Sequence, residues 1–132
     1  METIITAGAT ATAVGTGQAN TTAIATAQGV GSYAAQLCND LVLGGYNDWF
    51  LPSKDELHKM YINLQSGTDE NGVAYNAFVG NFALDAYWSS SELEGLNAEF
   101  FAYGEDFDPT VERPSALEKD NDLILVRCVR TF

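Results

Sequence analysis

A helix start signal at Ser53 constrains this chain more than any other local feature. Ser53 stands three residues before Glu56, which is the spacing of a capping box, in which each of the two side chains bonds the backbone of the other residue. Apolar residues then follow at i, i+3, i+4 and i+7, and these are Leu57, Met60, Tyr61 and Leu64. The pattern predicts a helix of about three turns with one buried stripe. It indicates fold and, by itself, no function.

Two further helices are expected before this one. Asn20 is expected to cap a short helical stretch that runs to Ala27, because asparagine is a favoured N-cap residue. Ser32 is expected to cap a second helix, whose apolar face consists of Tyr33, Ala34, Leu37, Cys38 and Leu41. The second pattern points Cys38 toward the core.

Several strands are expected as well. Alternation of alanine with threonine predicts a short edge strand over residues 9–14. Residues 87–92 predict a strand that runs into a polar turn, and Gly104 should end an aromatic segment at residues 98–103. Residues 123–130 are apolar on both faces, which is typical of a central strand. Residues 74–82, by contrast, carry aromatic side chains at helical spacing.

Composition sets limits on partners. The chain has 132 residues and a net charge of −12, which argues against nucleic acid or an anionic membrane as a partner. No apolar run approaches a membrane span, and no basic residue precedes Lys54, so no secretory signal is expected. Residues 92–122 hold ten acidic and two basic side chains. This segment is a solvated surface, an acidic face for a basic partner, or a set of calcium ligands.

The chain offers no convincing catalytic set. His58 is the only histidine, and the serines at 89–91 lack the glycines of a nucleophile elbow. Trp49 and Trp88 could stack on a sugar, but each sits in an apolar run and is expected in the core. Cys38 and Cys128 are either two buried thiols or one disulfide, and neither has a nearby zinc-ligand partner.

The strongest binding candidate is an aromatic and acidic segment that follows residue 92. Its large apolar residues are Leu93, Leu96, Phe100, Phe101, Tyr103 and Phe107. Aromatic side chains in an otherwise polar region are typical of a binding face. Strand alternation should place Phe101 and Tyr103 on one side and Phe100 and Ala102 on the other.

Three motifs, taken together, resemble a known family. GGYNDWFLPSKDEL at 44–57, YWSSSE at 87–92 and VRCVRTF at 126–132 resemble the domain at the C-terminus of the Legionella collagen-like adhesin. That domain is related to the variable proteins of diversity-generating retroelements. The resemblance covers roughly residues 14–132, and Glu99 departs from it where many relatives have an aromatic residue.

The resemblance implies an α+β, C-type-lectin-like fold, with two helices packed on a twisted, mainly antiparallel sheet and long ligand-binding loops. It implies binding and not catalysis, a helix–strand disulfide between Cys38 and Cys128, and a diversified surface over residues 93–122. The chain is interpreted as a single domain over residues 1–132, with residues 1–13 as a partial or flexible extension.

The expected function is therefore receptor recognition or adhesion on a cell, extracellular or virion surface. The expected partner is a glycan or a protein, and a protein partner should be basic. No membrane insertion is expected. No cofactor is expected either, although calcium is a competing explanation of the acidic residues. The alternatives are a structural module of a surface or phage-tail assembly and, third, an enzyme on the related formylglycine-generating fold. The expected ligand-binding residues are Leu93, Leu96, Glu99, Phe101, Tyr103, Glu105, Asp106, Phe107 and Asp108.

Overall fold

Helices and a small sheet make up the part of the chain that the computed structural model describes, which is residues 7–29, 31–94, 100–109, 116–121 and 123–131. The helices within it are α1 (Gly17–Gln28), α2 (Ala34–Asp40) and α3 (Lys54–Leu64). The strands are β1 (Ala86–Glu92), β2 (Phe101–Asp106) and β3 (Ala116–Glu118), paired antiparallel in the order β1-β2-β3. The α+β class is confirmed, with the three helices that the sequence patterns predict and one more than the resemblance implies.

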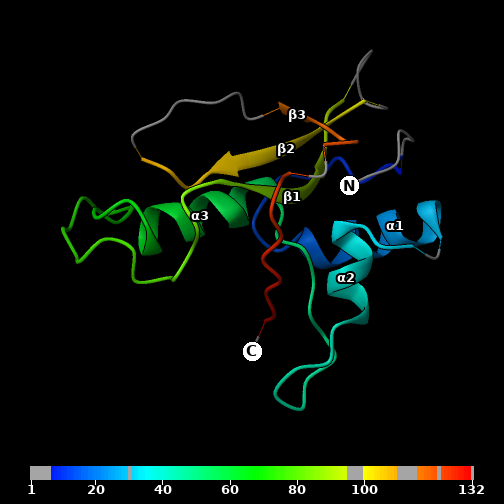
Figure 1. The fold of residues 1–132 in the computed structure, drawn as a ribbon, viewed down its shortest axis with the longest axis horizontal. Coiled ribbons are helices and arrows are strands. Elements are labelled where there is room, and N and C mark those ends of the chain that lie inside the picture. The colour runs from blue at the N-terminus through cyan, green and yellow to red at the C-terminus, as the bar shows by residue number, and fades with distance from the viewer. Residues whose placement is uncertain (1–6, 30, 95–99, 110–115, 122, 132) are drawn as a thin grey trace.

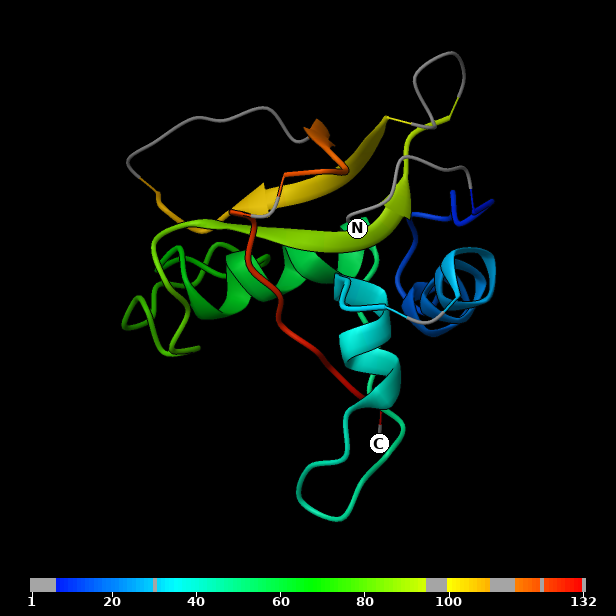
Figure 2. The same ribbon diagram turned by 45° about the vertical axis from the view of Figure 1, so that its right-hand side comes forward.

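The elements form two layers. Figures 1 and 2 both show the helices on one side of the sheet, with α3 beneath β1 and β2 and with α1 and α2 near the end of β1. α1 and α2 pack on each other, and α1 also contacts β1. Among the described residues, no helix is long and apolar enough to cross a membrane.

The predicted capping box is confirmed at the start of α3. The Glu56 backbone N–H donates to Ser53 Oγ at 3.3 Å, and the Ser53 N–H donates to Glu56 Oε1 at 2.8 Å. Glu56 also accepts from the Gly17 N–H at 3.0 Å. A side chain at position 17 would collide with the Leu51 carbonyl at 2.9 Å, so glycine there lets the start of α1 approach the start of α3.

The starts of the first two helices differ from the sequence predictions. α1 begins at Gly17 with Thr16 as its N-cap, and Asn20 lies inside the helix, where its buried amide donates to the Ala11 carbonyl at 2.7 Å. The predicted Asn20 cap is therefore wrong. α2 has Tyr33 and not Ser32 at its N-cap, and Leu37 is 52% exposed.

The three serines of β1 are buried in the sheet and do not form the predicted polar turn. Trp88 pairs with Gly104 and Glu92 with Ala102, so three residues on β1 stand opposite Tyr103 alone. This irregularity of the register is held by Ser89 Oγ, which donates to the Tyr103 carbonyl at 2.6 Å, and by Ser91 Oγ, which donates to the Ala11 carbonyl at 2.7 Å.

Three other expected elements are absent from the described residues. Residues 123–130 make no strand and contribute only two isolated bridges, Tyr87 to Leu125 and Phe50 to Val129. Residues 74–82 form no helix, because Phe78 has a φ of 66°, outside the helical region. Residues 9–14 form no strand, although Glu92 holds this segment through the Ala9 N–H at 2.9 Å.

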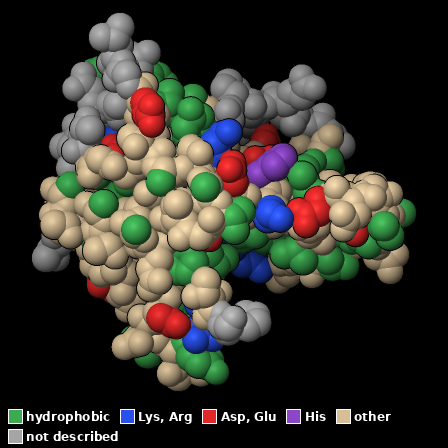
Figure 3. All heavy atoms as spheres, turned by 180° about the vertical axis from the view of Figure 1, so that it is seen from behind, with side chains coloured by type: hydrophobic (Ala, Val, Ile, Leu, Met, Phe, Trp, Pro, Cys, Tyr) green, Lys and Arg blue, Asp and Glu red, His purple; other side chains and the backbone are tan. Residues whose placement is uncertain are grey.

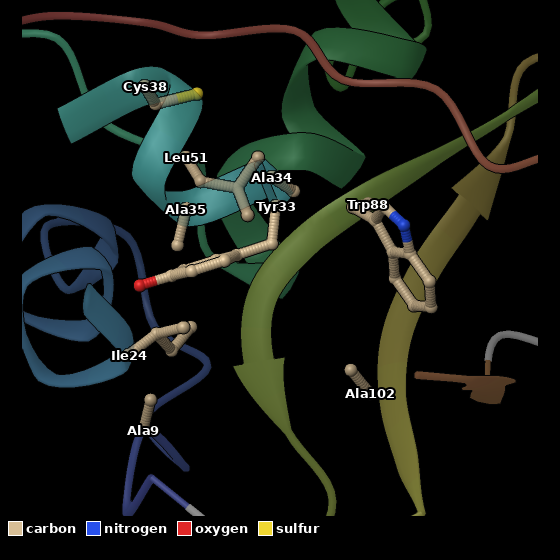
Figure 4. Close-up of a cluster of buried hydrophobic side chains, with 9 residues drawn as sticks. All are labelled: Ala9, Ile24, Tyr33, Ala34, Ala35, Cys38, Leu51, Trp88 and Ala102. Carbon is tan, nitrogen blue, oxygen red and sulfur yellow. The ribbon is translucent and has the colours of Figure 1, made fainter. Parts of the chain in front are cut away.

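Two apolar clusters meet β1 at neighbouring residues, the larger at Trp88 and the smaller at Tyr87. Figure 4 shows the larger cluster; its members are Ala9, Ile24, Tyr33, Ala34, Ala35, Cys38, Leu51, Trp88 and Ala102. The smaller consists of Leu57, Phe82, Tyr87 and Phe107. Trp88 is therefore a core residue as expected, whereas Trp49 is only half-buried.

Two long-range links close the fold. A disulfide joins Cys38 on α2 to Cys128, with Cα atoms 5.4 Å apart and a sequence separation of 90; this is the pairing that the resemblance implies. Glu92 and Lys119 form an ion pair with both side chains fully buried. The Glu92 carboxylate also accepts from the Ala7 N–H at 2.9 Å, so it joins the N-terminal segment to the sheet.

Candidate functional site

β2 presents a row of three side chains on one face. Successive residues of a strand point to opposite faces, and Phe101, Tyr103 and Glu105 are half-buried while Ala102 and Gly104 between them are buried. Gly104 was expected to end this segment, but it lies inside the strand. A side chain there would lie 2.8 Å from the Tyr87 carbonyl, so glycine is what lets β2 pair closely with β1.

α3 completes this face with two side chains one helical turn apart. Lys54 Nζ lies 5.1 Å from the centroid of the Tyr103 ring, within the range of a cation–π contact. His58 Nδ1 lies 3.1 Å from Glu105 Oε1. We call these five residues, Phe101, Tyr103, Glu105, Lys54 and His58, the β2–α3 face.

The β2–α3 face is hollowed at two places. Lys54, Asp55, His58 and Glu105 line a cavity of about 240 Å³. A second hollow of about 210 Å³ lies against Phe100, Phe101, Glu118 and Asp120. In Figure 3, basic, acidic and histidine side chains gather near the middle of the side seen from behind. The surface therefore combines aromatic side chains with charged side chains of both signs.

Acidic groups dominate the electrostatics near this face. The pKa of Tyr61 on α3 is raised above its usual value, mainly by burial and then by the negative charges of Glu105 and Asp106. Asp106 in turn accepts from the Asp108 N–H through Oδ1 at 2.9 Å. A ligand that approaches the end of β2 thus meets a negative potential.

The structure brings part of the expected binding set together. Phe101, Tyr103 and Glu105 lie in one row, and the half-buried Leu93 donates its N–H to the Phe101 carbonyl at 3.4 Å. Asp106 and Asp108 are half-buried at the end of the strand. The remaining expected residues, Leu96 and Glu99, lie outside the described residues.

Phe107 does not belong to the binding face, and its assignment there is wrong. Its side chain is fully buried, with ring centroids 4.4 Å from Phe82, 5.0 Å from Tyr87 and 5.5 Å from Tyr61. Gln65 Nε2 donates to its carbonyl at 2.8 Å. Its acidic sequence neighbours suggested exposure, but the chain turns back onto α3 directly after β2, so the ring anchors the smaller core cluster.

No metal site is apparent in the ranges that the structure describes. Within them, no group of three or more His, Cys, Asp or Glu side chains is placed to hold an ion. Glu105 and Asp106 are adjacent strand residues and point to opposite faces, which separates two of the acidic side chains that a calcium ion would have to share.

Sequence reasoning missed Lys54 and His58 as members of the face. They are four residues apart on α3, a spacing that places two side chains on the same side of a helix, and this signal was available. What the sequence could not supply is that α3 packs against β2.

Comparison of the chain with family models, with curated proteins and with solved structures gives no match.

Proposed function

We propose that this domain binds a protein or glycan ligand through the β2–α3 face, as a C-type-lectin-like module displayed on a cell, extracellular or virion surface. The observation that supports this most is the row of Phe101, Tyr103 and Glu105 on a hydrogen-bonded strand, flanked by Lys54 and His58 from a capped helix. Binding residues work best when a rigid frame holds them in position.

The chemistry of the face suits recognition. Tyrosine and phenylalanine supply contact area at a low cost in side-chain entropy, and both rings are half-buried and therefore partly ordered before a ligand arrives. The charges favour a basic partner if the ligand is a protein. The resemblance adds the proposal that residues 93–122 differ among related copies, which sequencing of such copies and of the DNA downstream would test.

The first experiment identifies a ligand and then maps it. The domain is screened on a glycan array and against surface-protein extracts, and the affinity of the ligand found is measured for Phe101→Ala and Tyr103→Ala. We expect each substitution to weaken binding by roughly tenfold or more. Phe78→Ala is the matched control, because Phe78 is a 51% exposed aromatic in the loop after α3 and should bind like wild type.

A salt series tests the electrostatic part. If the ligand is a basic protein, its association rate should fall as NaCl rises from about 0.05 M to about 0.5 M, and Glu105→Gln should flatten that dependence. Wild-type affinity in both aromatic variants, together with loss in Phe78→Ala, would place the ligand on the loop after α3 and overturn the proposal.

A further inference from the structure

The extended segment at residues 127–131 uses only one of its two backbone edges. The Val129 N–H donates to the Phe50 carbonyl at 2.9 Å, and the Phe50 N–H donates to the Val129 carbonyl at 2.8 Å. Backbone groups of successive residues in an extended strand point to opposite edges, so those of Cys128 and Arg130 point away from Phe50. Within the described residues, these two make no backbone–backbone hydrogen bond. Figure 1 shows the segment, in red, as a single extended trace.

An apolar pocket lies against the same segment. Its volume is about 530 Å³, within the range typical of ligand sites, and it is lined by Leu43, Gly44, Tyr46, Trp49, Cys128, Val129 and Arg130. The Trp49 indole N–H is engaged by the Tyr46 carbonyl at 3.2 Å, so the ring contributes apolar surface to the pocket. The side chains of Leu43 and Tyr46 are 59% and 49% exposed, so they are not part of the core.

A guanidinium group, that of Arg130, lines the pocket in a chain that is otherwise strongly acidic. Arg127 and Arg130 are the only charged residues in 123–131, in a chain of net charge −12. Asp48 accepts from Arg130 Nε at 2.8 Å and from Nη2 at 3.0 Å, while the guanidinium carbon lies 3.6 Å from the Tyr46 ring centroid. Within the described residues, Nη1 of Arg130 has no hydrogen-bond partner. An acidic group on a partner is therefore complementary here.

We propose that this site binds an extended peptide segment of another protein by strand addition. The main chain of the peptide pairs with Cys128 and Arg130, one large apolar side chain enters the pocket, and a neighbouring carboxylate reaches Arg130. Strand addition combines main-chain hydrogen bonds with side-chain pockets in this way. The site shares no residue with the β2–α3 face, so it is an addition to the function proposed above. A second copy of this chain is a poorer occupant, because both copies would carry the same large negative charge.

The test selects peptides that depend on the pocket. A phage library of random peptides of about seven residues is panned on the wild-type domain and depleted on the variant Leu43→Asp, so that binders of any other surface are removed. Val42→Asp is the matched control. Val42 is 71% exposed and adjacent in sequence but does not line the pocket.

We expect the surviving peptides to carry a large apolar residue near an acidic one and to bind Val42→Asp as they bind wild type. Their affinity for the Leu43→Asp variant should be roughly tenfold or more lower. Methylation of alternate peptide nitrogens should abolish binding, and hydrogen exchange at the Cys128 or Arg130 amide should slow in the complex. The proposal is overturned if no peptide survives the depletion, if survivors bind without slowing exchange at either amide, or if the pocket is instead filled by a second copy at high protein concentration.

Discussion

Ser53 acts on two parts of the chain at once. Its hydroxyl accepts from the Glu56 N–H and also donates to the Ala13 carbonyl at 2.9 Å, and its side chain is fully buried. Ser53→Ala should therefore cost about 1–2 kcal/mol of unfolding free energy, which urea titration measures. Ser32→Ala is the matched control, since Ser32 is exposed and caps no helix; equal losses in both variants would contradict the role of the cap.

Asp48 should make stability depend on pH in a defined direction. The two hydrogen bonds from Arg130 hold the pKa of this carboxyl below its ordinary value. A carboxyl with a lowered pKa in the folded state stabilises the fold above its unfolded pKa of about 3.9, and this contribution disappears as pH falls through the folded value.

The Asp48→Asn variant tests this directly. It should unfold more easily than wild type at neutral pH, and the difference should close as pH falls below about 3.9. Asp120→Asn removes an exposed carboxyl of the same kind and should show no such pH-dependent difference. If the difference in unfolding free energy between Asp48→Asn and wild type stays constant down to acidic pH, Arg130 does not lower this pKa.

At the scale of elements, the buried Glu92–Lys119 pair joins the end of β1 to the residue after β3. Removal of one partner from a buried pair leaves an uncompensated charge and typically costs about 3–5 kcal/mol. We expect Lys119→Met to fall in that range. The double variant with Glu92→Gln should lose less than the sum of the two single losses, and strict additivity in a thermal or urea series would mean that the two side chains do not act as a pair.

The elements also show what sequence could predict. α3 was predicted correctly because its signals, Ser53, Glu56 and the stripe that begins at Leu57, lie within one segment. Residues 123–130 were misassigned because an apolar run on both faces is equally typical of a central strand and of a segment that packs without a ladder. Here Ile124 and Val126 pack against the larger cluster, and in the part of the chain that the structure describes the segment pairs only at Leu125 and Val129.

The candidate site divides in the same way. Alternation along β2 correctly placed Phe101 and Tyr103 on one face, because a strand sets side-chain direction locally. The contribution of Lys54 depends on how α3 meets β2, which is a long-range relation that one sequence does not specify. The same holds for Phe107, whose burial depends on Phe82 and Tyr87 from distant positions.

At the scale of the whole molecule, excess negative charge opposes folding. With a net charge of −12, the compact state suffers self-repulsion that added salt screens. We expect the melting temperature at neutral pH to rise with NaCl up to about 0.5 M. The rise should vanish near the sequence pI of about 4.1, where the net charge is small. A fall with salt at neutral pH would mean that the ion pairs outweigh the repulsion.

The disulfide has a mechanical consequence. When the chain is pulled at Ala7 and Thr131, the covalent link between Cys38 and Cys128, whose sequence separation is 90, carries the force past the loop that it closes. An extended residue spans about 3.5 Å, so the residues from Ala7 to Cys38 of the oxidised chain should extend to about 110 Å when they unfold. Reduction should release about 310 Å more, which single-molecule stretching resolves. The β2–α3 face lies entirely inside the shielded loop, so a ligand held there would stay bound to residues that tension cannot stretch while the link is intact.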